Sequence, residues 1–342
     1  MTLNLLVFDY REVEKKFFRT NKFDNFNIKF YTESLTPETV DNIPGEILDN
    51  TNVISVFIDS VIDGKVINAF KNLRIISTRS TGYDHIDLNA CRNKNIAVVN
   101  VENYGETSVA QYTFGLILSL VRKIFPAVKA VKNCESEEIN FNGRDISKLT
   151  LGVVGTGSIG AAVCGLAKCF KMNILAYDIN QKRELDGVQD LKYVTFDELL
   201  QKSDIITIHV PYTGQNYHMF SHEQFNMMKN GAYFINTSRG ELVDLQELYK
   251  HIENGKIAGA ALDVLMCESI NFKCKKLAED LGKESLECYN EAKTVEKLRD
   301  FDNVLITPHI AYDTQDSVDY ILSVTMRSIR EVIYGGKVSR IV

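Results

Sequence analysis

The sequence predicts an α/β protein built from two doubly wound domains, each a parallel sheet covered by helices on both faces. Three observations lead to this prediction. The 342 residues suit two domains of ordinary size. Short runs rich in Val, Ile, Leu and Phe alternate with amphipathic helical stretches, the usual pattern of parallel sheets with crossover helices. A second series of this kind begins near residue 150 and carries a glycine-rich turn after its first strand.

The composition excludes several classes of protein. Hydrophobic residues make up 45% of the chain and charged residues 25%, which excludes disordered and collagen-like proteins. A net charge of −6 argues against a nucleic-acid or anionic-membrane surface. No apolar run approaches the roughly 20 residues of a membrane helix, and the N-terminus lacks the basic start of a signal peptide. Seven cysteines without a CxxC pair favour reduced thiols over a disulfide framework. We therefore expect a soluble cytoplasmic protein.

The first hundred residues contain five expected strands separated by helical stretches. The strands are Leu3–Phe8, Asn27–Tyr31, Val53–Ile58, Leu73–Thr78 and Ile96–Asn100. The stretches Glu12–Arg19 and Gly64–Lys71 have the pattern of amphipathic helices. No glycine-rich loop follows the first strand, so we expect no nucleotide site in this domain.

A long apolar stretch, Thr107–Lys123, separates the two series. It is hydrophobic over more than one face, so we expect a domain interface or a partner subunit to bury it. We place the domain boundary near its start. The first domain then spans residues 1–100, completed by 313–342, which contain the amphipathic stretch Gln315–Tyr334, and the second spans 101–312.

The second series contains six expected strands and four expected helices. The strands are Thr150–Val154, Asn173–Tyr177, Asp204–His209, Ala232–Asn236, Ala258–Asp263 and Asn303–Thr307. The helices are Ser158–Phe170, Phe196–Lys202, His222–Met228 and Leu245–Asn254. A charged helical excursion, Cys267–Arg299, separates the last two strands. It is interpreted as a substrate-selective lid, an oligomer contact or a neutral surface insertion, and we favour the last.

The strongest local motif is Gly155-Thr156-Gly157-Ser158-Ile159-Gly160, which follows an apolar strand and opens the first helix of the second series. Its glycines allow a tight turn, close approach of the backbone to a pyrophosphate, and close helix–strand packing. The helix N-terminus offers its amides to phosphates. Asp178 ends the next strand, where a carboxylate binds ribose hydroxyls and repels a 2′-phosphate. The motif therefore predicts NAD as the cofactor.

Four polar residues are candidates for the chemistry. A nicotinamide enzyme needs a group that gives or takes the substrate proton, and a cation suits an anionic substrate. Arg239, His209 and His309 all follow expected strands, at the edge where such sheets bind ligands. Glu268 lies just beyond another strand and is placed to hold an imidazole. Periodicity does not choose between the two histidines.

Several motifs from residue 79 to the C-terminus are similar to those of one family. They are Arg79–Asp87 (RSTGYDHID), Val109–Phe114, the Gly155–Gly160 loop with Asp178, His209–Pro211, Asn236–Gly240 with Leu242–Asp244, Gly259–Val264 and Thr307–Ala311. On these motifs the chain resembles the D-isomer-specific 2-hydroxyacid dehydrogenases, and among them the D-lactate dehydrogenase branch. The resemblance implies a flavodoxin-like substrate domain and a Rossmann NAD domain. It also implies that His309 is the acid/base, that Arg239 binds substrate and that Glu268 pairs with the histidine.

The same resemblance assigns binding residues. It implies an NAD cleft lined by Gly155, Gly157, Ser158, Ile159, Gly160, Asp178, Val210, Pro211, Asn216, Thr237, Ser238 and Asp263. It implies substrate contacts from Thr81, Gly82, Tyr104 and Tyr312, with ordinary interdomain packing as the alternative for Tyr104. Lys171 stands where the family usually has a glycine, so we expect it to adopt a positive φ. No cluster has metal-ligand spacing, so no metal is expected.

The expected reaction is the reversible NADH-dependent reduction of a 2-oxo acid to the (R)-2-hydroxy acid, with pyruvate or a larger apolar 2-oxo acid as substrate. The alternatives are reduction of glyoxylate or hydroxypyruvate, and a non-catalytic protein that senses NAD(H). Because Arg239, Glu268 and His309 occur together, we favour catalysis. The apolar Thr107–Lys123 helix and the family resemblance predict a homodimer built on the NAD domains.

Overall fold

The structure is a computed structural model that describes residues 2–102, 104–134, 140–181, 191–272, 286–336 and 341–342. The chain divides into two compact units, each described by itself below. Unit 1 contains Met1–Tyr104 and Asp313–Val342, and unit 2 contains Gly105–Tyr312. No helix in these described ranges is long and apolar enough to cross a membrane.

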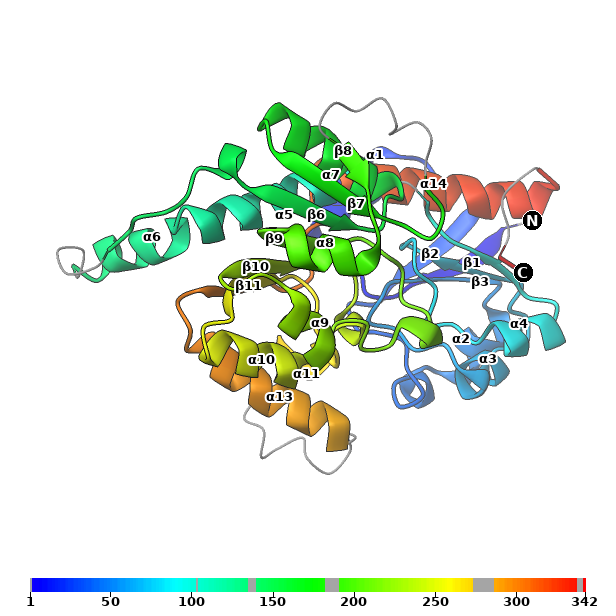
Figure 1. The fold of residues 1–342 in the computed structure, drawn as a ribbon. Coiled ribbons are helices and arrows are strands. Elements are labelled where there is room, and N and C mark those ends of the chain that lie inside the picture. Colours follow the sequence, from blue (N-terminus) through cyan, green and yellow to red (C-terminus); the bar gives the residue numbers. More distant parts are fainter. Residues whose placement is uncertain (1, 103, 135–139, 182–190, 273–285, 337–340) are drawn as a thin grey trace. The chain divides into compact units, whose positions relative to one another are not determined.

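Unit 1 is a five-stranded parallel sheet with helices on both faces (Figure 1). The strands are β1 (Leu3–Val7), β2 (Phe26–Phe30), β3 (Val53–Val56), β4 (Ile75–Thr78) and β5 (Ala97–Val99). Their order, β2-β1-β3-β4-β5, is that of flavodoxin-like sheets. On one face lie α1 (Lys15–Thr20) and α14 (Gln315–Tyr334), and on the other lie α2 (Gly45–Asn50), α3 (Gly64–Ala69) and α4 (Leu88–Asn93). The described residues of the unit also include two short 3-10 turns, η1 (Glu12–Glu14) and η2 (Val40–Asn42).

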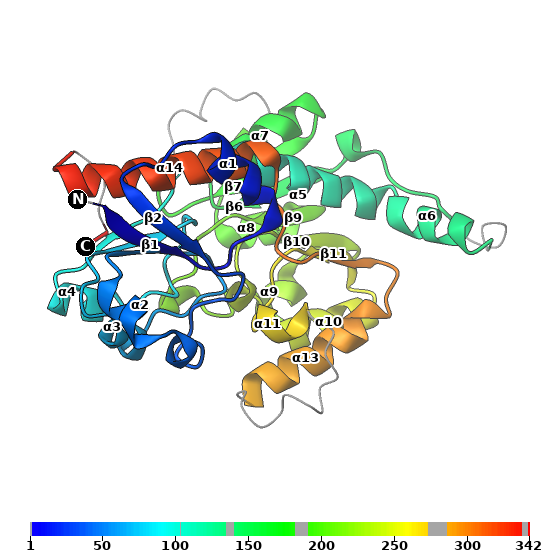
Figure 2. The same ribbon diagram turned by 180° about the vertical axis from the view of Figure 1, so that it is seen from behind.

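Unit 2 is a seven-stranded parallel sheet, also covered on both faces (Figure 2). The strands are β6 (Thr150–Val154), β7 (Asn173–Tyr177), β8 (Leu191–Tyr193), β9 (Ile205–Ile208), β10 (Ala232–Asn236), β11 (Ile257–Leu262) and β12 (Val304–Ile306). Their order, β12-β11-β10-β9-β6-β7-β8, is the Rossmann order extended by one strand. The predicted α/β class with two doubly wound sheets is confirmed. The expectation of six strands is wrong, because the three-residue edge strand β8 is too short to show a period.

The helices of unit 2 form two layers. On one face lie α5 (Glu106–Val121) and α7 (Ser158–Cys169). On the other lie α8 (Phe196–Lys202), α9 (His222–Met227), α10 (Leu245–Glu253) and α13 (Leu286–Arg299). The described part of unit 2 also contains the helices α6 (Ile124–Lys132) and α11 (Glu268–Asn271) and the 3-10 turns η3 (Ile146–Lys148), η5 (Gly214–Asn216) and η6 (Gly240–Leu242). Lys171, just after α7, has φ 57°, so its predicted positive φ is confirmed.

One row of paired residues crosses the unit 2 sheet at the carboxyl ends of its strands. The register aligns, in this order, Tyr177, Val154, Ile208, Asn236, Leu262 and Ile306. The residues that follow them are Asp178, Gly155, His209, Thr237, Asp263 and Thr307. The glycine loop, the His209 turn and the segments that lead to Arg239 and His309 therefore share one edge of the sheet, where doubly wound folds bind ligands.

The helix α5 buries its apolar side chains inside unit 2. Phe114, Ile117 and Val121 pack with α7 and the sheet. The expectation that a domain interface or partner must bury Thr107–Lys123 is therefore wrong for most of this stretch. The exposed apolar side chains lie on the next helix, α6, which extends away from the sheet of its unit in both ribbon views (Figures 1 and 2). They are Ile124, Phe125, Val128 and Val131, which are 46–66% exposed.

The excursion Cys267–Arg299 is described in part, as α11 and α13, and its residues 273–285 lie outside the described ranges. The helix α13 packs against α10 and α11, and its Val295 and Leu298 are fully buried in the core. The interpretation as a neutral surface insertion is therefore wrong for α13, because this helix completes one helical layer of unit 2.

A carboxylic acid, Glu291, is buried on α13 with 8% of its surface exposed. Burial, reinforced by Asp244 and Glu287 nearby, raises the pKa of Glu291 to about 8. The folded chain thus holds this proton more tightly than the unfolded chain does. As the pH rises from about 5 to 8, the carboxyl ionises first in the unfolded chain, and the free energy of unfolding falls.

Replacing Glu291 by glutamine should raise the free energy of unfolding at pH 8.5 by on the order of 2–4 kcal/mol, and change it little at pH 5. Gln keeps the shape of the protonated acid, and its oxygen still accepts the hydrogen bond from the Met266 amide. Denaturant unfolding at the two pH values measures the effect. Glu296→Gln, at an exposed position of the same helix, is the matched control. It should change the free energy of unfolding by the same amount at pH 5 and at pH 8.5. A Glu291→Gln effect that does not change with pH would contradict the account.

Candidate active site

The glycine loop leaves β6 in a conformation that only glycine fits at two positions. Gly155 has φ 90°, and a Cβ there would lie 2.7 Å from the His209 carbonyl oxygen. A Cβ at Gly160 would lie 1.9 Å from the Gly155 carbonyl oxygen. A Cβ at Gly157, in contrast, would meet no atom within 4 Å. The turn is therefore tightly packed on its inner side and open at Gly157, where a phosphate can approach.

These residues fit an adenine dinucleotide. The helix α7 has 12 residues and begins directly after Gly157, which has no side chain to occupy the first amides. At the end of β7, Asp178 accepts hydrogen bonds from the Thr156 amide (2.6 Å) and hydroxyl (3.0 Å) and from the Asn180 amide (2.8 Å). A carboxylate offers about four acceptor sites. Asp178 thus shapes the loop and keeps capacity for a ribose hydroxyl.

Replacing Gly160 by alanine should lower the melting temperature and weaken NADH binding at least about 10-fold. The new methyl group would push α7 away from the loop, and overpacking of this kind costs roughly 1–3 kcal/mol or more. Fluorescence titration with NADH and a thermal melt measure both effects. Gly165→Ala is the matched control, because it lies on the same helix and its Cβ would meet no atom within 4 Å. Equal NADH affinity in the two variants would contradict this role of Gly160.

A histidine and a carboxylate meet next to this edge. His309, three residues after β12, has Nδ1 2.8 Å from Oε2 of Glu268 on α11. Both side chains stay partly exposed, at 20% and 23%. His309 has φ 53°, a backbone conformation that non-glycine residues rarely adopt. The Tyr312 ring stands edge-on to the imidazole, with 6.3 Å between centroids. Strained backbone at a partly exposed titratable group is typical of active sites.

The loop that carries His309 is shaped by the fully buried Asp263. Its Oδ1 accepts hydrogen bonds from the Thr307 hydroxyl (2.6 Å) and the Ile310 amide (3.1 Å), and its Oδ2 accepts one from the Ala311 amide (2.8 Å). Burial raises the pKa of Asp263 above its ordinary value. Asp263 is predicted to line the NAD cleft; in the described residues, the hydrogen bonds of its carboxylate come from the His309 loop, and its amide donates to the Asn236 carbonyl.

The structure separates the two histidine candidates. His209 lies behind the glycine loop, with Nε2 2.9 Å from the Thr207 hydroxyl oxygen. Loss of solvent lowers the pKa of His209 to about 3, so its imidazole is neutral at neutral pH. His309 differs in having a carboxylate, Glu268, 2.8 Å from its Nδ1 and in keeping part of its ring exposed. Of the two, His309 has the surroundings that suit proton exchange with a ligand.

Arg239 begins the turn after β10, at the same edge. The Asn236 side chain fixes this turn: its Nδ2 donates to the Arg239 carbonyl (2.7 Å), and its Oδ1 accepts from the Ser238 amide (2.9 Å). The Arg239 guanidinium donates to the Ser238 carbonyl at 2.8 Å through one nitrogen. A guanidinium has five N–H donors in a planar fork, the geometry that binds a carboxylate bidentately.

The Arg239 turn lies directly against the segment that leads to Glu268. A Cβ on Gly240 would lie 2.1 Å from the Leu265 carbonyl carbon and 2.2 Å from the Met266 nitrogen. The two backbones are thus in contact, with Arg239 on one and Glu268 two residues further along the other. Unit 2 therefore brings together a cation, an imidazole–carboxylate pair and a dinucleotide loop.

The other residues predicted to bind NAD lie on the same unit. The Ser238 hydroxyl donates to the Val210 carbonyl. The hydroxyls of Thr237 and Thr113 are 3.1 Å apart. Asn216 closes its own turn, donating to the Pro211 carbonyl (2.8 Å). These contacts position the segments after β9 and β10.

Three residues predicted to bind substrate, Thr81, Gly82 and Tyr104, belong to unit 1 and Tyr312 belongs to unit 2. Thr81 follows β4, and its carbonyl accepts from the Asn100 side chain (2.9 Å). Its hydroxyl donates to the Val101 carbonyl (3.0 Å). Within the described part of the chain, no hydrogen bond uses the amides of Thr81 and Gly82. Two backbone donors are therefore available at the end of β4.

The expectation of reduced thiols is wrong for one pair, since Cys267 and Cys288 form a disulfide. Cys91, Cys134, Cys164 and Cys169 are free, and Cys274 lies outside the described residues. The sequence carries no signal for this pairing, because the two cysteines are separated by 21 positions and meet only when α13 packs on α11. Thr307 and Glu291 likewise had no local signal. In the described ranges, no group of His, Cys, Asp and Glu is arranged to hold a metal ion.

Comparisons with known proteins agree with this geometry. Residues 114–311 match the family model described as D-isomer specific 2-hydroxyacid dehydrogenase, NAD binding domain. A D-specific alpha-keto acid dehydrogenase of Enterococcus faecium is 40% identical over 80% of this chain and 81% of that relative. An aromatic 2-oxoacid reductase of Clostridium sporogenes is 33% identical over 91% and 92%. The crystal structure of a D-lactate dehydrogenase from Aquifex aeolicus, complexed with NAD and lactic acid, superposes with a TM-score of 0.84 at 34% identity, covering 97% of this chain and 96% of that one.

Proposed function

Because the chain belongs to the D-isomer-specific 2-hydroxyacid dehydrogenase family, we propose that it reduces pyruvate or a larger apolar 2-oxo acid to the (R)-2-hydroxy acid. The family and the relatives are NAD-dependent oxidoreductases, so the non-catalytic alternative is set aside. The observation that carries the proposal is the 2.8 Å contact between His309 and Glu268, next to the sheet edge of the glycine loop.

The proton step is assigned to His309. With Nδ1 donating to Glu268, Nε2 is the nitrogen left to donate a proton to the carbonyl oxygen of the substrate. The Glu268 carboxylate orients the ring and compensates its positive charge. The Gly155–Gly160 loop and Asp178 would hold NADH, whose chemistry when bound would be the transfer of a hydride to the carbonyl carbon. In the reverse direction, neutral His309 takes the proton back from the hydroxyl group.

Binding of the substrate carboxylate is assigned to Arg239 of unit 2, and the amides of Thr81 and Gly82, on unit 1, remain predicted substrate contacts. A 2-oxo acid has a carboxylate beside the reacting carbonyl, and a guanidinium binds such a group through two parallel hydrogen bonds. A contact of this kind recognises the 2-oxo carboxylate shared by all candidate substrates and does not select among their side chains.

Rates of NADH oxidation with a panel of 2-oxo acids test the proposal. The panel contains pyruvate, phenylpyruvate, 2-oxo-4-methylpentanoate, glyoxylate and hydroxypyruvate. The proposal expects the highest kcat/KM for one of the first three. A preference for glyoxylate or hydroxypyruvate would replace it with the reductase alternative, and no reduction of any acid would overturn it.

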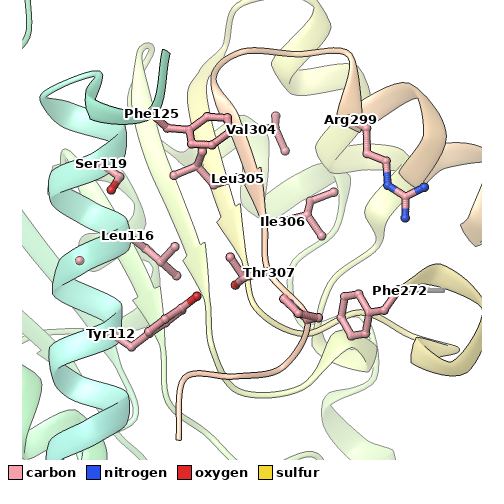
Figure 3. Close-up of a pocket in the computed structure, with 12 residues that line it drawn as sticks. Tyr112, Leu116, Ser119, Phe125, Phe272, Arg299, Val304, Leu305, Ile306 and Thr307 are labelled. Carbon is pink, nitrogen blue, oxygen red and sulfur yellow. The ribbon is translucent and has the colours of Figure 1, made fainter. Parts of the chain in front are cut away.

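We further propose that the protein is a homodimer built on unit 2. A cavity of about 660 Å³ lies over the edge strand β12 and is lined by α5 and by Phe272 and Arg299 (Figure 3). Phe125 also lines this cavity and is one of the exposed apolar side chains of α6. An open cavity continuous with an apolar stripe and an unpaired strand edge is typical of a surface that another chain covers. A second copy, related by twofold symmetry, is the proposed occupant.

Replacing Val128 by glutamate should shift the protein from dimer to monomer, because it buries a charge in the proposed interface. Sedimentation equilibrium measures the mass. Val61→Glu is the matched control, since Val61 is as exposed as Val128 (47% and 46%) but lies on unit 1. A monomeric wild type, or a Val128→Glu protein that stays dimeric, would contradict the proposed interface.

A further inference from the structure

The segment that carries Glu268 is held at both ends by α13. At its start, Cys267 is joined to Cys288 by the disulfide, with 5.7 Å between their Cα atoms. The Met266 amide donates to the buried Glu291 carboxyl. At its end, the Arg299 guanidinium donates to the Asn271 carbonyl. The excursion that interrupts the regular series of strands and helices therefore contacts the chain on both sides of Glu268.

The disulfide is attached at Cys267, a residue with a strained backbone conformation. Cys267 has φ 52° and ψ 46°, the left-handed conformation that non-glycine residues rarely adopt. It immediately precedes Glu268 and is the N-cap of α11, which has only four residues. So short a helix does not hold its own geometry. External contacts must fix the direction in which Glu268 leaves the backbone, and the disulfide is the contact nearest to it in the chain.

We propose that Cys267 and Cys288 are positioning residues for catalysis, and that their disulfide keeps Glu268 against His309. The inference rests on the proposed function of this pair. In the oxidised protein the link holds Glu268 Oε2 at 2.8 Å from His309 Nδ1. A dithiol breaks the Sγ–Sγ bond: two electrons and two protons pass to the two cysteines, which become thiols, and the dithiol closes into its own disulfide. Reduction thus loosens Glu268 and lowers activity.

The remaining described cysteines are not expected to produce this response. Cys91 and Cys164 are buried, and burial raises the pKa of Cys91 to about 11 and that of Cys164 to about 12, so both stay as unreactive thiols. Cys134 and Cys169 are exposed and free, and both lie outside the machinery described above. They can be replaced by serine to remove their thiol chemistry.

The test compares the full-length enzyme before and after treatment with a dithiol. Peptide mapping first establishes the Cys267–Cys288 link in the oxidised sample and its loss in the reduced one. Reduction should lower kcat about 10-fold, a fraction of the roughly 10²–10⁴-fold that a positioned acid–base group contributes. NADH affinity, measured by fluorescence, should not change. Cys288→Ser should resemble the reduced enzyme without treatment, and the Cys134→Ser/Cys169→Ser protein should respond as wild type does.

A double-mutant comparison separates positioning from general stabilisation. If the disulfide acts through Glu268, reduction of a Glu268→Gln enzyme should change its kcat by less than about twofold. An equal loss in both backgrounds would show that the link merely stabilises unit 2 and would overturn the proposal. The proposal also fails if wild-type activity is unaffected by complete reduction, or if mapping finds Cys267 paired with another cysteine.

Amide hydrogen exchange gives a readout that does not depend on turnover. The amides of Asn271 and Phe272 donate to the carbonyls of Cys267 and Glu268, so their protection reports on this segment. Reduction should speed their exchange. Unchanged protection would overturn the proposal. If reduction speeds exchange but the protein reduces no 2-oxo acid, the disulfide still stabilises this segment, and it is the proposed function that is overturned.

Discussion

Replacing His309 by glutamine should lower kcat about 10²–10⁴-fold while NADH binds as tightly as to the wild type. Glutamine fills much of the same space, but it has no proton to give to the carbonyl oxygen of the substrate. The glycine loop and Asp178, which are assigned to the cofactor, do not depend on the imidazole. Steady-state kinetics with pyruvate or the best 2-oxo acid of the panel, together with NADH fluorescence titration, measure the two quantities.

His222→Gln is the matched control, because it removes an exposed imidazole that also pairs with a carboxylate, Glu247, at 2.9 Å. Its kcat should stay within about twofold of wild type, since it lies outside the assigned site. If the His309→Gln enzyme retained most of its activity, the acid–base role would be lost, and neutral His209 would have to be reconsidered.

Replacing Arg239 by glutamine should reduce kcat/KM for the 2-oxo acid roughly 30- to 5000-fold. Removing one partner of a desolvated charge pair costs about 2–5 kcal/mol, because the substrate carboxylate is left without its counter-charge. Arg239→Lys should recover only part of the loss, since an ammonium does not reproduce the bidentate fork. The side chain belongs to a turn that is fixed through Asn236 and Ser238, so the backbone should survive either change.

The matched control for Arg239 is Arg144→Gln, a half-exposed arginine whose ion pair with Asp204 is 3.8 Å long. It should leave kcat/KM unchanged. NADH affinity should be unaltered in all three variants. A loss in NADH affinity equal to the loss in kcat/KM would mean that Arg239 serves the cofactor rather than the substrate.

Much of the fold could be predicted from the sequence. The strands at Thr150–Val154, Asn173–Tyr177 and Ala232–Asn236 begin and end at the predicted residues. Each is a short, mostly apolar run in a parallel sheet that is buried on both faces, so the pattern alone marks its ends. The strand Leu191–Tyr193 was missed because three residues at a sheet edge show no period. The helix Ile124–Lys132 was missed because its apolar stripe faces outward and continues the stretch before it.

The candidate site also has a part that could be predicted from the sequence and a part that could not. The glycine loop and Asp178 follow from spacing, because phosphate binding requires particular backbone geometry at fixed positions. The choice between His209 and His309 did not follow from the residues themselves and needed the family resemblance. In the structure, the carboxylate partner of one and the desolvation of the other distinguish them.

The contacts that hold the site residues in place could not be predicted from any local sequence pattern. The contacts of Asp263 with the His309 loop and the link between Cys267 and Cys288 depend on which segments pack together. The disulfide joins two helices across residues with no cysteine motif, so composition alone favoured free thiols. Such long-range contacts are set by tertiary packing, which a single sequence does not display.

Chiral analysis of the product formed from pyruvate and NADH tests the central claim most directly. The account predicts lactate of the (R) configuration from the wild type, and a rate at least 100-fold lower with His309→Gln. A product of the (S) configuration, or equal rates for the two proteins, would contradict it.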